Sequence, residues 1–188
     1  HSFLYLWGPG GSGKSHLLQA ACHAADAQGG RAAYLPLAEL ITCPVDVLDG
    51  MENMDLVCVD QLECLSGQLA WQQSMFHLYN RLRDSGKRLF AAGSSSPAAL
   101  GLELPDLVSR LGWGPVYQVH VLNDEQKAQA LQLRASHRGM GMSEEVAAYL
   151  LAHGPREMHR LFALLDTIDE RSLIEQRRLT IPFVRQLL

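Results

Sequence analysis

Short apolar runs alternate with amphipathic stretches along the first two thirds of the chain. The apolar runs predict β-strands at residues 3–7, 31–35, 55–60, 87–93 and 116–121. Apolar positions at helical spacing predict helices at residues 14–28, 44–51, 71–83 and 105–111. Strands that alternate with helices favour a parallel sheet, and the nearly continuous run at 55–60 is typical of a strand covered on both faces.

The last third of the chain has a helical pattern only. Asn123 and Gln126 have the spacing of a capping box at the start of a helix. Further helices are expected to start at Ser143, Pro155 and Thr180. We therefore expect an α/β subdomain at residues 1–121 and a helical lid at residues 122–188.

A glycine-rich loop joins the first predicted strand to the first predicted helix. Its residues are Gly8, Pro9, Gly10, Gly11, Ser12, Gly13, Lys14 and Ser15, and His16 follows them. The glycines let backbone N–H groups surround phosphate oxygens, and Lys14 adds a positive charge. The Ser15 hydroxyl can bind a phosphate-bound Mg²⁺, and the start of the helix favours an anion. The loop predicts a P-loop that binds ADP or ATP with Mg²⁺.

The same glycines also satisfy a dinucleotide fingerprint, because Gly8, Gly10 and Gly13 are spaced G-x-G-x-x-G. A Rossmann site has no use for Lys14-Ser15, and it needs an acid at the end of the second strand. That strand runs into Pro36-Leu37 instead. We reject the dinucleotide interpretation, and a chance glycine-rich turn is the remaining alternative.

Asp60 ends the third predicted strand, where a Walker B carboxylate would hold Mg²⁺ through water opposite Ser15. An ordinary aspartate at a strand end is the alternative. ATPases of this class usually have a second acid at the next position, but this chain has Gln61. A neutral amide can orient water but cannot take its proton. We therefore expect nucleotide binding with weak or no intrinsic hydrolysis.

Composition excludes several other classes of function. The 188 residues carry a net charge of −4, and basic residues gather only near the end, so we expect no strong autonomous DNA binding. Cys22, Cys43, Cys58 and Cys64 lack C-x-x-C spacing, which favours buried, reduced thiols over zinc ligands. No membrane-length apolar stretch or leader sequence is present, so a cytoplasmic protein without a membrane partner is expected.

Several motifs resemble the DnaA family of AAA+ proteins. They lie at residues 13–18, 57–60, 109–114 and 155–157, with further likeness at 47–52, 78–81, 104–107 and 179–184. The resemblance spans essentially the whole chain. It implies an AAA+ P-loop module: a five-stranded parallel sheet with flanking helices and a C-terminal helical lid. The chain stops at the lid without a DNA-binding helix-turn-helix, which favours the family's regulatory members over the initiator itself.

The resemblance also implies roles for three residues. Arg110 corresponds to the arginine finger, which acts in trans on a neighbour's nucleotide, although a solvated arginine on a short helix is the alternative. Arg156 corresponds to sensor II, just inside a helix start and directed at the protein's own nucleotide; a surface arginine paired with Glu157 is the alternative. Ser94 occupies the sensor I place but departs from the usual Asp-Arg.

The function that the resemblance implies is regulatory. We expect a nucleotide-binding protein that stimulates hydrolysis of the ATP bound to the DnaA initiator and supplies Arg110 as the finger. Family members act with the DNA sliding clamp, through an N-terminal segment that this chain lacks, and a homo-oligomer is possible. The alternatives are a self-hydrolysing AAA+ ATPase that serves as initiator or helicase loader, and an adaptor that keeps the fold only to bind proteins.

Overall fold

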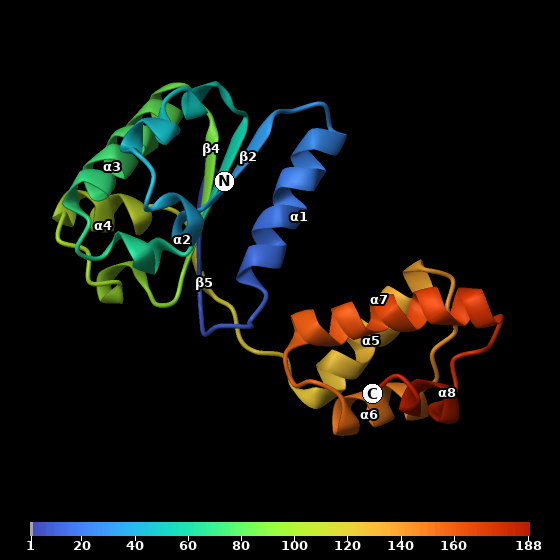
Figure 1. Cartoon of the computed structure of the whole chain (residues 1–188). Coiled ribbons are helices and arrows are strands. Elements are labelled where there is room, and N and C mark those ends of the chain that lie inside the picture. The colour runs from blue at the N-terminus through green and yellow to red at the C-terminus, as the bar shows by residue number, and fades with distance from the viewer. Residues whose placement is uncertain (1) are drawn as a thin grey trace. The chain divides into compact units, whose positions relative to one another are not determined.

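The computed structural model describes residues 2–188. Contacts within the chain divide it into two compact units, His1–Val121 and Leu122–Leu188. The first unit contains strands and helices, and the second is built from helices (Figure 1). Each unit has a hydrophobic core of its own.

Five parallel strands form the sheet of the first unit, as predicted. They are β1 (Phe3–Trp7), β2 (Ala32–Pro36), β3 (Leu56–Asp60), β4 (Arg88–Gly93) and β5 (Val116–Gln118). Their order across the sheet is β2-β3-β4-β1-β5. Register pairs Pro36 with Asp60 and Trp7 with Gly93, so the carboxyl ends of the strands meet at one edge of the sheet. That edge carries the glycine-rich loop and Asp60.

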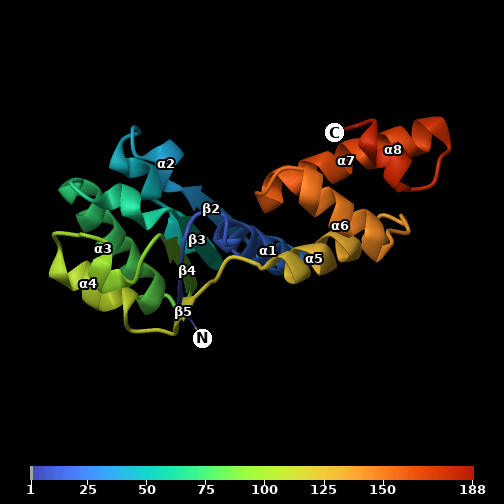
Figure 2. The ribbon, with the colours of Figure 1, turned by 90° about the horizontal axis from the view of Figure 1, so that it is seen from below.

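Helices cover both faces of this sheet (Figures 1 and 2). One face packs against α1 (Lys14–Ala27), and the other packs against α3 (Leu69–Asp84) and α4 (Pro105–Leu111). All five residues of β3 are buried, with Leu56 and Cys58 in the core under α1 and Val57 and Val59 in the core under α3. The predicted covering of this strand on both faces is confirmed.

The connection between β2 and β3 differs from the single predicted helix at 44–51. It contains α2 (Leu37–Leu40) and two 3₁₀ helices, Val45–Leu48 and Met51–Asn53. Gly50 separates the two 3₁₀ helices in a left-handed conformation, with φ of +81°, which a continuous helix cannot accommodate. Two further 3₁₀ helices, Leu62–Leu65 and Pro97–Ala99, were not predicted.

The second unit contains α5 (Asp124–His137), α6 (Glu144–His153), α7 (Met158–Glu175) and α8 (Ile181–Arg185). The capping box of Asn123 and Gln126 is present, and Ser143 caps α6 through the N–H of Val146. The prediction that a helix starts at Pro155 is wrong, because α7 begins at Met158. Glu157, the residue before it, has an extended backbone, so the helix cannot start earlier.

The four cysteines differ in burial. Cys22 and Cys58 are buried as expected, but Cys43 is exposed and Cys64 is partly buried. Cys43 lies in the irregular connection after α2, outside the cores. Among residues 2–188, no helix combines the length and apolar character needed to cross a membrane.

Candidate nucleotide-binding site

The glycine-rich loop begins at a crowded point between β1 and α1. Gly8 is buried, and its N–H donates to the Gly93 carbonyl oxygen at 3.3 Å. A Cβ at Gly8 would overlap the carbonyl oxygen of Val119, so a side chain does not fit there. The start of the loop is therefore held between the end of β4 and the residue that follows β5.

The loop ends where α1 begins. Gly13 precedes the helix with φ of +97° and contributes no side-chain cap. The N–H groups of the first helical turn, which includes Lys14, Ser15 and an exposed His16, have no carbonyl one turn earlier within the helix. Together with the helix dipole, this arrangement suits an anion such as phosphate.

The Lys14 ammonium lies against the loop. Its Nζ donates to the carbonyl oxygens of Gly8 at 2.7 Å and Pro9 at 2.9 Å, and to Ser12 Oγ at 3.4 Å. The positive charge is therefore held among the backbone groups that would surround a phosphate. These residues fit the phosphates of a nucleotide.

Asp60 lies at the end of β3 and is only 2% exposed. Its Oδ2 accepts a hydrogen bond from the Tyr34 hydroxyl at 2.7 Å, and its Oδ1 accepts one from the N–H of Gln61 at 2.9 Å. Tyr34 also lies near the side chains of Ser15 and Gln19, which act to lower its pKa. Burial, followed by the bond to Asp60, raises the pKa of Tyr34 to about 12, so the phenol stays protonated at neutral pH.

Ser15 and Asp60 both lie close to Tyr34. A serine hydroxyl and a carboxylate are the oxygen donors that Mg²⁺ prefers, and this ion usually binds one or two carboxylates together with phosphates and water. Among residues 2–188 no group of three His, Cys, Asp or Glu side chains could hold a metal ion. The donors fit Mg²⁺ only as a companion of a bound nucleotide.

Tyr34 was not among the predicted site residues. Its only signal in the sequence is its place near the end of a strand, two residues before Pro36. The hydroxyl reaches Asp60 because β2 pairs directly with β3, and that strand order is not visible in the sequence.

Gln61 has an unusual backbone conformation and an occupied side chain. Its φ of +61° and ψ of +47° are left-handed, and its Oε1 accepts a hydrogen bond from the N–H of Ala38 at 3.3 Å. The amide oxygen is therefore directed to the start of α2. Gln61 holds the backbone beside Asp60 through this contact.

An acid missed by the sequence reasoning lies close by. Glu63 Oε2 accepts a hydrogen bond from the N–H of Ser94 at 2.9 Å, so this carboxylate reaches the end of β4. The Tyr5 hydroxyl donates to the Ser95 carbonyl oxygen at 2.8 Å, and burial, followed by the charge of Glu63, raises the pKa of Tyr5. Ser94 itself is exposed, and its backbone is fixed by Glu63.

Arg110 lies in the last turn of α4, on the face of the sheet opposite α1. Its guanidinium carbon is 4.1 Å from the ring centroid of Trp113 and 5.9 Å from that of Phe76. The structure therefore places Arg110 away from α1 and the helix start that follows the P-loop. Cation–π contacts of this kind hold a long side chain in a defined direction.

Arg156 belongs to the second unit and lies outside a helix. Its side chain is exposed, and its carbonyl oxygen accepts a hydrogen bond from Lys127 Nζ at 3.1 Å. The expectation that Arg156 lies just inside a helix is wrong, because α7 starts two residues later.

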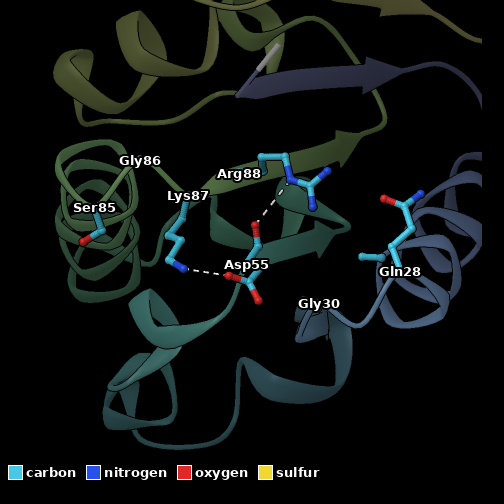
Figure 3. Close-up of a pocket in the computed structure, with 8 residues that line it drawn as sticks. Gln28, Gly30, Asp55, Ser85, Gly86, Lys87 and Arg88 are labelled. Atoms are coloured by element: carbon cyan, nitrogen blue, oxygen red, sulfur yellow. Dashed lines mark hydrogen bonds and ion pairs between the residues drawn. The ribbon is translucent and has the colours of Figure 1, made fainter.

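A pocket at the other end of the sheet is separate from these residues. Figure 3 shows Lys87 and Arg88 directed toward Asp55 at the amino ends of β3 and β4. Asp55 Oδ1 is 2.6 Å from Lys87 Nζ, and Asp55 Oδ2 accepts from the N–H of Arg31 at 2.9 Å. The bond from Lys87 is the main reason that the pKa of Asp55 is lowered to about 2. Asp60 lies at the opposite edge of the sheet, so this pocket is not the P-loop site.

Two protein-family models match the chain. The bacterial DnaA ATPase domain matches residues 1–118, and the lid domain of Hda matches residues 124–188. The chain belongs to the bacterial DnaA ATPase family. Its lid is similar to that of Hda, so the resemblance inferred from the P-loop and the later motifs is confirmed.

Solved structures share the fold of this chain. Domain III of DnaA from Thermotoga maritima has a TM-score of 0.78 at 21% identity, covering 100% of this chain and 83% of that one. A DNA replication initiation factor has a TM-score of 0.71 at 26% identity and 94% coverage of this chain. AMPPCP-bound DnaA from Aquifex aeolicus has a TM-score of 0.70 at 24% identity and 93% coverage of this chain. This DnaA-family chain spans 58% and 59% of the latter two.

Proposed function

We propose that this DnaA-family protein binds ADP or ATP with Mg²⁺ at Gly8–Ser15 and Asp60, and that the nucleotide is a structural ligand. The support is the position of Lys14 among the loop carbonyls and the start of α1 directly after the loop. A similar protein, DnaA from Aquifex aeolicus, is bound to AMPPCP, an analogue of ATP. A ligand whose free concentration is one hundred times its Kd adds about 2.7 kcal/mol to the free energy of unfolding.

Weak hydrolysis of the protein's own nucleotide is part of this proposal. The amide of Gln61 cannot accept a proton from water, and its Oε1 is bonded to Ala38. The sensor I place has only Ser94, whose backbone is bonded to Glu63. Neither group is arranged to activate a water molecule.

The hydrolysis that matters is proposed to occur in a partner, the ATP-bound DnaA initiator, with the sliding clamp present on DNA. The observation that carries this proposal is Arg110, whose guanidinium is stacked at 4.1 Å on Trp113 at the end of α4. Trp113 is 62% exposed, so the pair lies at the surface where a partner can reach it. An arginine placed on a transferring phosphate stabilises the charge of the transition state. A protein with this role acts in the cytoplasm. Arg156 is still proposed as the sensor II residue, and only its position in the sequence supports that role.

The test follows conversion of DnaA-bound ATP to ADP in the presence of clamp and DNA, with an N-terminal clamp-binding segment joined to each variant. The wild type is compared with Arg110→Ala and with Arg83→Ala, a control at an exposed arginine at the end of α3. We expect Arg110→Ala to slow conversion about a thousandfold while its ADP affinity stays unchanged. Arg83→Ala should convert ATP at the wild-type rate. Equal rates for the wild type and Arg110→Ala would exclude the finger role.

One observation favours a second function, an ATPase that hydrolyses its own ATP. Glu63 places a carboxylate at the end of β4, close to the sensor I place. Turnover by the isolated protein, abolished both by Lys14→Ala and by Glu63→Gln, would support that function. Turnover that is negligible without DnaA supports the regulator.

A further inference from the structure

Trp113 is an exposed aromatic residue on a fixed piece of backbone. Its N–H donates to the Arg110 carbonyl oxygen at 3.2 Å, and Leu111, two residues before it, is buried in the α/β core. On the other side, Gly114 packs against Phe3 so closely that a Cβ there would overlap the Phe3 carbonyl oxygen. The backbone is therefore held on both sides of Trp113, whereas its side chain is 62% exposed.

The Trp113 ring lies against the guanidinium of Arg110. The guanidinium carbon is 4.1 Å from the ring centroid, and the two residues are three positions apart at the end of α4. Among aromatic rings, that of tryptophan attracts a cation most strongly. A carboxylate partner would offset the charge of Arg110 and use its N–H donors. A ring does neither, so the charge and the donors of the guanidinium stay suited to a phosphate.

The stack also limits the directions that the long Arg110 side chain can take. An unrestrained arginine loses rotamer entropy when it engages a phosphate. A contact that orders the side chain beforehand removes part of that loss. Because an arginine finger acts mainly on the charge of the transition state, this benefit belongs to the rate of the bound complex more than to its affinity.

We propose that Trp113 is the positioning residue for Arg110, and that its ring holds the guanidinium in the direction in which it meets the phosphates of a partner's ATP. The inference rests on the proposed finger role and adds a residue to it. It gives the exposed ring a function that its place outside the core does not supply. The requirement is for an aromatic face, because an apolar side chain of similar size cannot attract the cation.

The kinetic test uses the conversion of DnaA-bound ATP with clamp, DNA and the joined clamp-binding segment, at increasing concentrations of each variant. The variants are Trp113→Leu, Trp113→Phe and the control Tyr117→Leu, at a 56% exposed aromatic residue of β5. We expect Trp113→Leu to lower the rate at saturation about fivefold, which corresponds to a contact of about 1 kcal/mol. Its half-saturating concentration should stay within about twofold of the wild type. Trp113→Phe and Tyr117→Leu should keep both values within about twofold.

The NMR chemical shifts of the Arg110 side chain test the stack without any partner. The ring current of Trp113 should move the Arg110 δ protons upfield of those of Arg83, which pairs with Asp84. We expect Trp113→Leu to lose this shift and Trp113→Phe to keep most of it. Wild-type Arg110 shifts equal to those of Arg83 would overturn the inference, whether or not the variants fold.

The kinetic outcomes separate three possibilities. A rate at saturation that is unchanged in Trp113→Leu overturns the positioning role. If this variant only raises the half-saturating concentration, Trp113 is a docking contact, and the inference is also wrong. Equal rates for the wild type and Arg110→Ala are a different failure, because they remove the proposed finger itself.

Discussion

Gly8 and Gly10 lie two residues apart in one loop, but the space around them differs. A Cβ at Gly8 would meet the Val119 carbonyl oxygen, whereas one at Gly10 has no atom within 4 Å. The requirement for glycine at the first position is therefore steric and belongs to the folded protein. At Gly10 the fold itself leaves space for a side chain.

The free energy of unfolding without nucleotide should separate the two positions. Gly8→Ala forces the end of β1 away from Val119, and we expect a loss of about 1–3 kcal/mol. Gly10→Ala should change the stability by less than about 0.5 kcal/mol. Urea denaturation followed by circular dichroism measures both. Equal losses in the two variants would contradict the steric explanation.

At the scale of elements, the amino ends of three neighbouring strands are joined by one carboxylate. Asp55 precedes β3, bonds the N–H of Arg31 before β2, and pairs with Lys87 before β4 (Figure 3). These contacts hold the register of β2, β3 and β4 at the edge opposite the P-loop. These contacts lower the pKa of Asp55 from 3.8 to about 2, and the hydrogen bond from Lys87 has the largest effect.

Asp55→Asn should therefore make the free energy of unfolding less dependent on pH between about pH 4 and pH 2. A carboxyl group with a lowered folded-state pKa stabilises the fold above about pH 4, and this stabilisation is lost as pH falls toward 2. We expect the wild type to be more stable than Asp55→Asn at pH 7, with the difference shrinking between pH 4 and pH 2. Urea titrations across this range measure it. A difference between the two proteins that stays constant across this range would contradict the argument.

At the scale of the whole molecule, the chain has two units with separate cores. Leu78 lies fully buried in the α/β core, and Leu165 lies fully buried in the core of the helical unit. Because each core is formed within one unit, a cavity in one should weaken that unit first.

Hydrogen exchange on a matched pair of variants tests this expectation. Leu165→Ala should reduce amide protection in residues 122–188 by the equivalent of about 2–5 kcal/mol and leave residues 2–121 as in the wild type. Leu78→Ala should give the opposite pattern. Loss of protection across both units in both variants would show that they unfold as one.

The sequence by itself determined the features that depend on a few neighbouring residues. The five strands, α1, the helices of the second unit and the loop at Gly8–Ser15 could be predicted because periodicity, caps and glycine-rich turns act over a few residues. The covering of β3 on both faces followed from its own apolar run. Even local signals failed at Pro155, where a residue suited to a first turn is followed by an extended Glu157.

Only the tertiary structure decided what surrounds Asp60. The Tyr34 hydroxyl bonds a carboxylate 26 residues away, and Glu63 bonds a backbone group 31 residues away. Both contacts depend on which strands are neighbours in the sheet, and that order results from packing of the whole α/β core. Gln61 likewise keeps its left-handed backbone because α2 and β3 lie where its side chain and N–H can bond. The residue types of a phosphate site are local, whereas the partners of its buried charge are set by long-range packing.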